Sequence, residues 1–204
     1  MLYRGKKLIS YIMKEQIFIS SFWHSNHSKK ALIERFKKYA LALEKNKKST
    51  IKSNQGGFHS KNLACSISLF SEFKEMIQPE IIEYCDSLHL KKPYNLIYKL
   101  WWLNINRFTH YNQPHNHARS ILSAVYYIQV PKNSGDFYFY SNQFKNLHGL
   151  DYNSYTQENS TFWKWRPCAG DFLLFPSNIL HSVGVNLNSK PRISLSFNLD
   201  IQQV

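Results

Sequence analysis

Four residues in the second half of the chain have the types and spacing of a metal centre with an anion-binding partner. His115 and His117 stand two positions apart, His181 follows 64 residues later, and Arg192 lies eleven residues beyond it. Positions i and i+2 of a strand point to the same side, so His115 and His117 can bind one metal ion together. A third ligand from a distant strand would complete a facial triad with open coordination positions. Because a guanidinium binds a carboxylate in bidentate fashion, the pattern predicts a metal centre that uses an organic acid.

The segment that begins at Arg192 alternates between polar and apolar residues, as a strand with two different faces would. Its polar positions are Arg192, Ser194, Ser196 and Asn198, and its apolar positions are Ile193, Leu195, Phe197 and Leu199. Successive side chains of a strand point to opposite faces. We therefore expect the polar set to face a cleft and the apolar set to face a core.

The first half of the chain predicts helices that would support these strands. Residues 28–48 carry apolar residues at three- and four-residue intervals, which indicates an amphipathic helix, with Ser28 as its N-cap. Residues 49–63 are predicted to be a loop. A second helix is expected from Leu69 to about Leu88, and Pro79 inside it should kink or divide it.

After Tyr94 the pattern changes to short strands with period-two alternation. The expected strands are residues 98–109, 120–130, 136–141, 170–175, 179–185 and 191–200. Helices followed by strands favour the α+β class, with helices on one face of a β-sandwich or jelly roll. We expect one domain over residues 1–204, with a basic, mainly helical support region (1–93) and a catalytic core (94–204). Residues 142–165 are hard to interpret and suggest an active-site loop.

Several motifs arrive in the order found in a known family: Ser53–Gly57, Trp102–Asn104, His115–His117, Leu122–Ile128, Gly170–Ser177, His181–Val183 and Arg192–Asn198. On these motifs the chain resembles the 2-oxoglutarate- and Fe(II)-dependent oxygenases, in particular the bacterial and phage group related to prolyl hydroxylases. The resemblance covers roughly residues 50–200. It implies a double-stranded β-helix, a cupin-like jelly roll.

The resemblance also implies residue roles. Fe(II) would bind His115, His117 and His181, and dioxygen would react there. The distal carboxylate of 2-oxoglutarate would bind Arg192, helped by Ser194 and Tyr127, with Asn104 and Asn198 as weaker candidates for the same pocket. The wider superfamily has a carboxylate where this chain has His117. Three neutral imidazoles would leave the iron with its full charge and alter its tuning.

Other residues could have chemical roles, but structural roles explain their presence equally well. Four tryptophans could form walls of the pocket or pack elsewhere: Trp101, Trp102, Trp163 and Trp165. His110 could support a ligand or lie on a turn, and Asp171 fits a turn but is a fallback ligand should His117 not bind. The other histidines, His24, His27, His59, His89 and His148, receive no role. Cys65, Cys85 and Cys168 are expected to be buried thiols.

The charge is concentrated at the beginning of the chain. Residues 1–60 contain thirteen Lys and Arg against three acids, so 13 − 3 = +10 of the total +13 lies there. The favoured interpretation is a basic face exposed to solvent. The alternative is that this face makes weak, sequence-independent contact with nucleic acid. No signal peptide or membrane span is expected, and Met13 is a plausible start. The odd cysteine count favours a reducing cytoplasm, which the resemblance implies to be that of a bacterium or phage-infected cell.

Three functions fit the sequence. The favoured one is hydroxylation of a C–H bond by an oxidoreductase that uses Fe(II), 2-oxoglutarate and dioxygen and releases succinate and carbon dioxide. Its substrate would be a peptide side chain, most simply prolyl, or a small molecule. A three-histidine dioxygenase of another class, such as a thiol dioxygenase, is the second. The third is a non-catalytic jelly-roll binding module with a basic nucleic-acid-binding arm.

Overall fold

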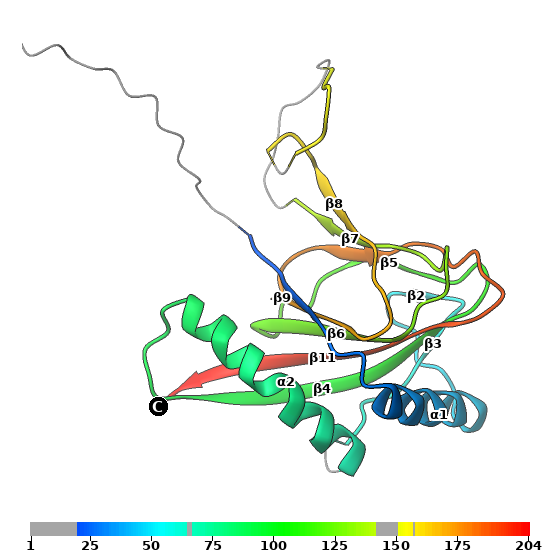
Figure 1. Cartoon of the computed structure of the whole chain (residues 1–204), viewed down its shortest axis with the longest axis horizontal. Coiled ribbons are helices and arrows are strands. Elements are labelled where there is room, and N and C mark those ends of the chain that lie inside the picture. The colour runs from blue at the N-terminus through cyan, green and yellow to red at the C-terminus, as the bar shows by residue number, and fades with distance from the viewer. Residues whose placement is uncertain (1–19, 65–66, 142–150, 157) are drawn as a thin grey trace, which may run out of the picture.

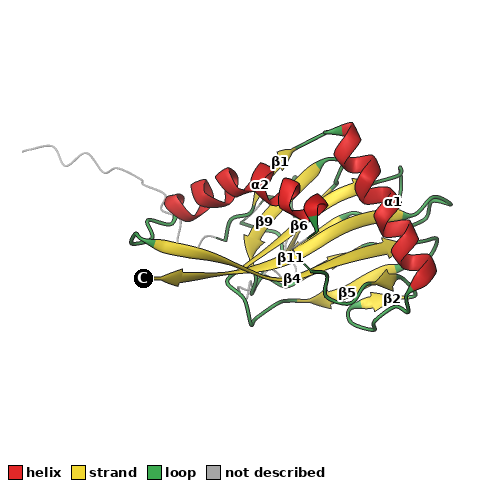
Figure 2. Ribbon diagram, turned by 90° about the horizontal axis from the view of Figure 1, so that it is seen from below, coloured by secondary structure: helices red, strands yellow, loops and turns green. Residues whose placement is uncertain are grey.

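Two antiparallel β-sheets face each other, and two helices cover the outer side of the larger sheet (Figures 1 and 2). The computed structural model describes residues 20–64, 67–141, 151–156 and 158–204. The larger sheet has the order β1-β9-β6-β11-β4-β3, and the smaller has the order β2-β5-β10-β7-β8. This is the jelly-roll arrangement expected for a double-stranded β-helix.

The strands of the larger sheet are β1 (Trp23–Asn26), β9 (Asp171–Pro176), β6 (Leu122–Gln129), β11 (Arg192–Gln203), β4 (Tyr94–Asn106) and β3 (Phe58–His59). Those of the smaller sheet are β2 (Asn54–Gln55), β5 (Tyr111–His115), β10 (His181–Val183), β7 (Phe137–Tyr140) and β8 (Phe162–Trp165). All six predicted strands are present, as β4, β6, β7, β9, β10 and β11. β1, β2, β3, β5 and β8 were not predicted.

The two helices begin and end close to the predicted residues. Helix α1 spans Lys30–Asn46 and helix α2 spans Ser68–Ser87. Ser28 does not cap α1, because the helix begins after Lys29 and the Ser28 hydroxyl donates to Asn26 instead. Pro79 lies inside α2 without dividing it, so the alternative of two separate helices is wrong. No described helix is long and apolar enough to cross a membrane.

The main core lies between the helices and the outer face of the larger sheet. Phe36 and Phe73 from the two helices meet edge to face, and Phe73 packs in turn on Trp101 and Phe197. A second apolar cluster lies between the sheets and includes Phe137, Phe139, Leu173 and Phe175. The helices therefore support one face of the larger sheet and leave its other face to the space between the sheets.

Of the three cysteines, Cys85 is buried as expected, whereas Cys168 is exposed, so that prediction was wrong for Cys168. Cys168 lies in the turn before β9, where its backbone N–H donates to Asp171. Its side chain is exposed because this turn lies at the surface. Cys65 and His148 lie outside the described residues.

Candidate active site

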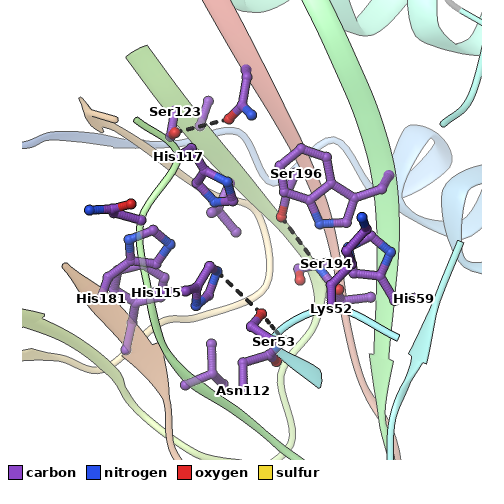
Figure 3. Close-up of a pocket in the computed structure, with 18 of the residues that line it drawn as sticks. Lys52, Ser53, His59, Asn112, His115, His117, Ser123, His181, Ser194 and Ser196 are labelled. Carbon is purple, nitrogen blue, oxygen red and sulfur yellow. Dashed lines mark hydrogen bonds between the residues drawn. The ribbon is translucent and has the colours of Figure 1, made fainter. Parts of the chain in front are cut away.

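A pocket of about 520 Å³ opens between the two sheets (Figure 3). Its walls come from β4, β6 and β11 on one side and from β5 and β10 on the other. The polar face of β11 enters it, because Arg192, Ser194, Ser196 and Asn198 all line the cavity while Ile193, Leu195, Phe197 and Leu199 lie in the main core. The alternation read from the sequence thus corresponds to a real division between pocket and core.

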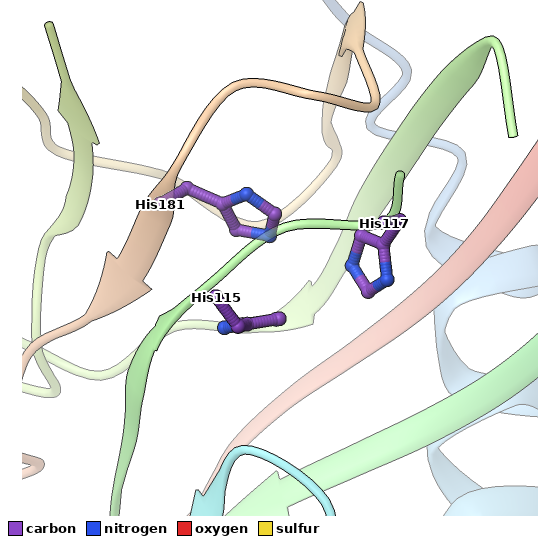
Figure 4. A group of neighbouring side chains, drawn as sticks. All are labelled: His115, His117 and His181. Atoms are coloured by element: carbon purple, nitrogen blue, oxygen red, sulfur yellow. The ribbon is translucent and has the colours of Figure 1, made fainter. Parts of the chain in front are cut away.

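Three histidines converge at one end of this pocket (Figure 4). One potential ligand atom from each of His115, His117 and His181 lies within 4.8 Å of the other two. The His115 and His181 rings are closest, with centroids 4.3 Å apart. His115 ends β5, His117 follows it, and β10 places His181 directly opposite His115 in the smaller sheet. This register brings His115 and His181 together, whereas His117 lies beyond the end of β5, so the expectation that one strand carries both His115 and His117 was wrong for His117.

Backbone carbonyls orient two of these rings. His115 Nδ1 lies 2.7 Å from the Gln113 carbonyl oxygen, and His181 Nδ1 lies 2.9 Å from that of Ile179. A carbonyl can only accept, so each Nδ1 carries the proton and each Nε2 keeps a lone pair for a metal. Phe137 stacks on His181 at 5.3 Å and restricts its rotation. The two imidazoles are therefore held in the tautomer that a metal requires.

Burial keeps the three rings uncharged. It lowers the pKa of His115, and it lowers the pKa of His117 to about 4 and that of His181 to about 3, with the neighbouring histidines adding to the effect for the latter two. Neutral imidazole is the form that binds a metal ion. At pH 7 the cluster thus offers three neutral nitrogen donors and no carboxylate.

A buried cation lies in the same pocket as the histidines. Arg192 is only 2% exposed, and within the described residues its Nε and Nη2 have no hydrogen-bond partner. Its guanidinium carbon lies 5.0 Å from the centre of the Tyr127 ring, and the Tyr127 hydroxyl is likewise buried without a partner there. Burial lowers the pKa of Arg192 from its ordinary value. Buried unpaired donors are costly, so this end of the pocket has the chemistry of a carboxylate site.

The remaining predicted pocket residues lie close by, with partners of their own. Ser194 pairs in register with both Tyr127 and Asn104, so the three cross the sheet in one row. Asn104 donates to Ser196, and its own amide oxygen is buried without a partner among the described residues. Asn198 accepts from Ser123. Asn104 and Asn198 both line the pocket, as expected from the sequence.

The four tryptophans lie in different environments, and one of them lines the pocket. Only Trp102 of the four lines the pocket, whereas Trp101 points to the main core from the other face of β4. Trp163 is 41% exposed, and Trp165 packs on Phe22. Of residues 142–165, none of the described positions lines the pocket, and residues 142–150 and 157 lie outside the described part.

Two fallback candidates have structural roles. His110 accepts the Arg107 backbone N–H through Nδ1, and its ring lies beneath Gly56. Asp171 accepts from Asn26 and from the Cys168 backbone. Neither residue lines the pocket. Both therefore match the turn interpretation.

Sequence reasoning missed β2 and β3, which lie in residues predicted to be a loop. β2 pairs with β5 in the smaller sheet and β3 pairs with β4 in the larger sheet, so residues 52–59 cross from one sheet to the other. Lys52, Ser53 and His59 from this crossing segment line the pocket beside the predicted residues. Ser53 Oγ lies 3.3 Å from His115 Nε2. The signal was the Asn54–Gly57 turn itself: Gly56 has φ +75°, and a Cβ there would meet the His110 ring at 2.5 Å. That close contact holds the segment between β2 and β3 against the turn before β5.

His59 was assigned no role from the sequence but is well placed in the pocket. Its ring stacks on Trp102 at 5.7 Å with 9° between the planes. Burial lowers the pKa of His59 and the nearby Lys52 ammonium lowers it further, whereas the bond from His59 Nδ1 to the Ser60 carbonyl opposes both. His59 is thus a fourth pocket histidine, outside the three-histidine cluster.

The part of the chain that forms most of this pocket matches a known protein family. Residues 100–198 match the family described as "Putative 2OG-Fe(II) oxygenase". These residues, just under half of the chain, include the three histidines and Arg192 and match the 2-oxoglutarate- and Fe(II)-dependent oxygenases. The family's reactions are oxidoreductions that use Fe(II), 2-oxoglutarate and dioxygen. No curated protein matches the chain in sequence.

Solved structures agree with the oxygenase fold. A prolyl-4-hydroxylase from Pseudomonas putida is 13% identical with a TM-score of 0.62, covering 91% of this chain and 94% of its own. A viral collagen prolyl hydroxylase from Paramecium Bursaria Chlorella virus-1, in complex with 2-oxoglutarate, is 12% identical with a TM-score of 0.56 and coverages of 90% and 96%. HygX from Streptomyces hygroscopicus, with nickel, 2-oxoglutarate and hygromycin B bound, is 11% identical with a TM-score of 0.62 and coverages of 91% and 84%.

The pocket of this oxygenase fits the cofactor and cosubstrate of the family. Three neutral imidazoles at one end of the cavity suit a divalent iron ion. The unpaired donors of Arg192 and Tyr127 suit the carboxylate of an organic diacid. Among the described residues, no aspartate or glutamate lines the pocket, so the donor set is more positive than one that includes a carboxylate ligand.

Proposed function

We propose that this oxygenase hydroxylates a C–H bond of a peptidyl, prolyl-type substrate, with His115, His117 and His181 as its iron ligands. The iron and 2-oxoglutarate supply the oxidant: one oxygen atom of dioxygen enters the C–H bond, the other enters succinate, and carbon dioxide is released. The chain provides the ligands, the carboxylate site and a partly enclosed pocket.

The observation that carries this proposal is the unpaired Arg192 guanidinium in the same cavity as the three histidines. A buried cation without an acidic partner among the described residues, in the same cavity as a metal site, fits a cosubstrate that carries a carboxylate. Arg192 would bind the distal carboxylate, with Ser194 and the Tyr127 hydroxyl as further donors. Burial raises the pKa of Tyr127 to about 12, so it donates as a neutral phenol at pH 7. Asn104 and Asn198 would line the same site.

The finer choice of substrate rests on analogy. Two similar structures are prolyl hydroxylases, and a third contains hygromycin B, so the same fold serves both peptides and small molecules. The pocket opens beside β2 and β3, where the wall includes Trp102 and Leu100. A flat apolar wall next to polar groups suits a prolyl ring and its flanking peptide groups.

The test is a titration of anaerobic Fe(II)-loaded protein with 2-oxoglutarate. We expect a visible metal-to-ligand charge-transfer absorption that saturates at one equivalent, and succinate release once air is admitted with a proline-containing peptide library. A three-histidine dioxygenase of another class would bind Fe(II) without this absorption. A binding module would show neither iron retention nor succinate.

The basic surface of α1 supports at most a weak second contact. Lys29, Lys30, Lys38 and Lys45 are exposed along this helix. Such a surface would bind nucleic acid without sequence preference and would lose the binding as salt rises. The free thiols Cys85 and Cys168 support a reducing, cytoplasmic setting in a bacterium or phage-infected cell.

A further inference from the structure

A continuous row of side chains crosses the larger sheet from the carboxylate site to the opposite rim of the pocket. Strand pairing places Tyr127 beside Ser194, Ser194 beside Asn104, and Asn104 beside His59. The row crosses from one strand to the next three times. Because neighbouring strands lie about 4.8 Å apart, the backbone positions at its two ends are roughly 14 Å apart. A five-carbon diacid bound at Arg192 is far too short to reach His59. The far end of the row is therefore available for another molecule.

The groups at that far end come from residues 52–59, which cross from the smaller to the larger sheet, and from β4. His59 stacks on Trp102, and Lys52 lies on the same side of the pocket, across from the three histidines (Figure 3). Ser53, the residue after Lys52, lies 3.3 Å from His115 Nε2. Asn54 stabilises this crossing segment by accepting the Lys52 backbone N–H and donating to the Gly57 carbonyl. A ligand held by Lys52 and His59 thus lies next to the metal ligands.

Lys52 and His59 would bind different chemical groups of a ligand. His59 Nδ1 donates to the Ser60 carbonyl at 2.8 Å, which leaves Nε2 as an acceptor. No partner for Nε2 occurs in the part of the chain that the structure describes. The Lys52 ammonium has no acidic partner there either, and no aspartate or glutamate lines the pocket in these residues. A ligand that satisfies both groups carries a negative charge and, close to it, an N–H donor.

From this geometry we infer that Lys52, His59 and Trp102 form the substrate subsite, and that they hold an acidic peptide residue next to the reacting carbon. Its carboxylate or phosphate pairs with Lys52, its backbone N–H donates to His59 Nε2, and the neighbouring ring packs on Trp102. The inference rests on the proposed function, since it assigns a substrate class to the same pocket. It names acidic peptides as the substrate class of this oxygenase.

The experiment measures peptide binding to the anaerobic Fe(II)- and 2-oxoglutarate-loaded protein, at 0.15 M salt. The probes are heptapeptides with a central proline flanked by Asp, phosphoserine, Asn or Lys. We expect the Asp or phosphoserine peptide to bind about three- to tenfold more tightly than the Asn peptide, and the Lys peptide to bind more weakly. The better of the two acidic peptides identifies carboxylate or phosphate as the preferred group.

Variants separate the roles of the two polar residues. Lys52→Gln should remove the preference among peptides, Lys52→Glu should reverse it, and Lys52→Arg should preserve it. Lys91→Gln removes the same charge from the turn between α2 and β4, outside the pocket, and should change nothing. His59→Phe keeps a ring on Trp102 but removes the acceptor, so it should weaken all four peptides alike, by about two- to tenfold.

Two failures can be told apart. Absence of the charge-transfer absorption in the parent would overturn the proposed function itself. If that absorption forms but all peptides bind equally or not at all, or if the preference survives Lys52→Gln, the subsite is wrong while the oxygenase assignment stands.

Discussion

The two faces of β11 are equally buried but chemically opposite. On the helix side, Ile193, Leu195, Phe197 and Leu199 are fully buried against apolar neighbours. On the pocket side, Arg192, Ser194, Ser196 and Asn198 are between 2% and 5% exposed. Burial of polar groups opposes folding unless hydrogen bonds compensate, and those of Arg192 are not compensated within the described residues. One face of the strand therefore stabilises the fold, while the other keeps unsatisfied groups for a ligand.

The comparison extends across the larger sheet. Tyr126 and Tyr127 are neighbours on β6, yet Tyr126 packs on Phe73 in the main core and Tyr127 lies against Arg192. Trp101 and Trp102 are divided in the same way on β4. Adjacent residues should therefore give opposite phenotypes when substituted: loss of stability on the helix side and loss of ligand binding on the pocket side.

The largest effect is expected at the centre of the helix side. Phe197 stacks on Trp101 with ring centroids 4.2 Å apart and is fully buried. Phe197→Ala should lower the free energy of unfolding by about 3–5 kcal/mol, because a large cavity replaces an aromatic side chain. Urea denaturation measures this change. Asn198→Ala, one residue further on the pocket side, should cost clearly less; an equal loss would contradict the division between the faces.

Arg192→Met should give the reverse phenotype. Loss of the charged contact should weaken 2-oxoglutarate binding by about 2–5 kcal/mol, measured from the charge-transfer titration. The free energy of unfolding of the ligand-free protein should stay the same or rise, because an apolar side chain replaces a buried cation without an acidic partner in the described residues. Arg119→Met, at an exposed position outside the pocket, is the matched control and should alter neither property. Parent-like affinity in Arg192→Met would remove Arg192 from the cosubstrate site.

The division between the faces could be predicted from the sequence because period-two alternation over residues 192–199 is a strong local signal. Together with the spacing of His115, His117 and His181, it predicted a metal-containing cleft, and the order of helices and strands predicted an α+β jelly roll. The double-stranded β-helix and the roles of the pocket residues came from the resemblance to the oxygenases. The same alternation would have assigned Trp101 and Trp102 to opposite faces had it been applied to them. The face to which a residue of a long strand points can thus be predicted from the local sequence pattern.

The segment of residues 52–59, which carries Lys52 and His59 between the two sheets, could not be predicted in this way. β2 and β3 are two residues each, too short for any periodicity, and their positions depend on pairing with β5 and β4. The contact of Gly56 with His110 joins residues far apart in the chain. Likewise β8 has three consecutive exposed residues, so it lacks the alternation that indicates a strand. Long-range contacts define these elements.

On the facing sheet, the comparison predicts that only the clustered histidines bind iron. His117→Ala should weaken Fe(II) binding by more than about 100-fold, because loss of an outer partner alone costs 10–100-fold. His59→Ala should retain stoichiometric iron, since His59 lies outside the cluster. Anaerobic dialysis followed by iron analysis distinguishes them, and circular dichroism checks that both variants fold. Stoichiometric iron in His117→Ala would indicate a site made by two histidines or by another ligand.

The smallest effects, and the sharpest test, come from the two neighbouring tyrosines. The Tyr127 hydroxyl is buried without a partner in the described residues, whereas that of Tyr126 donates to the His27 carbonyl at 2.9 Å. Tyr127→Phe should weaken 2-oxoglutarate binding by on the order of 1 kcal/mol and leave unfolding unchanged or slightly less favourable, because it removes an unsatisfied hydroxyl. Tyr126→Phe should lower stability by about 1 kcal/mol and leave 2-oxoglutarate affinity unchanged, because its hydroxyl bonds only within the fold. Both variants lose one oxygen atom and keep the ring, so differences in side-chain volume cannot explain opposite results. If both lost stability alike, Tyr127 would have a structural partner rather than a role in cosubstrate binding.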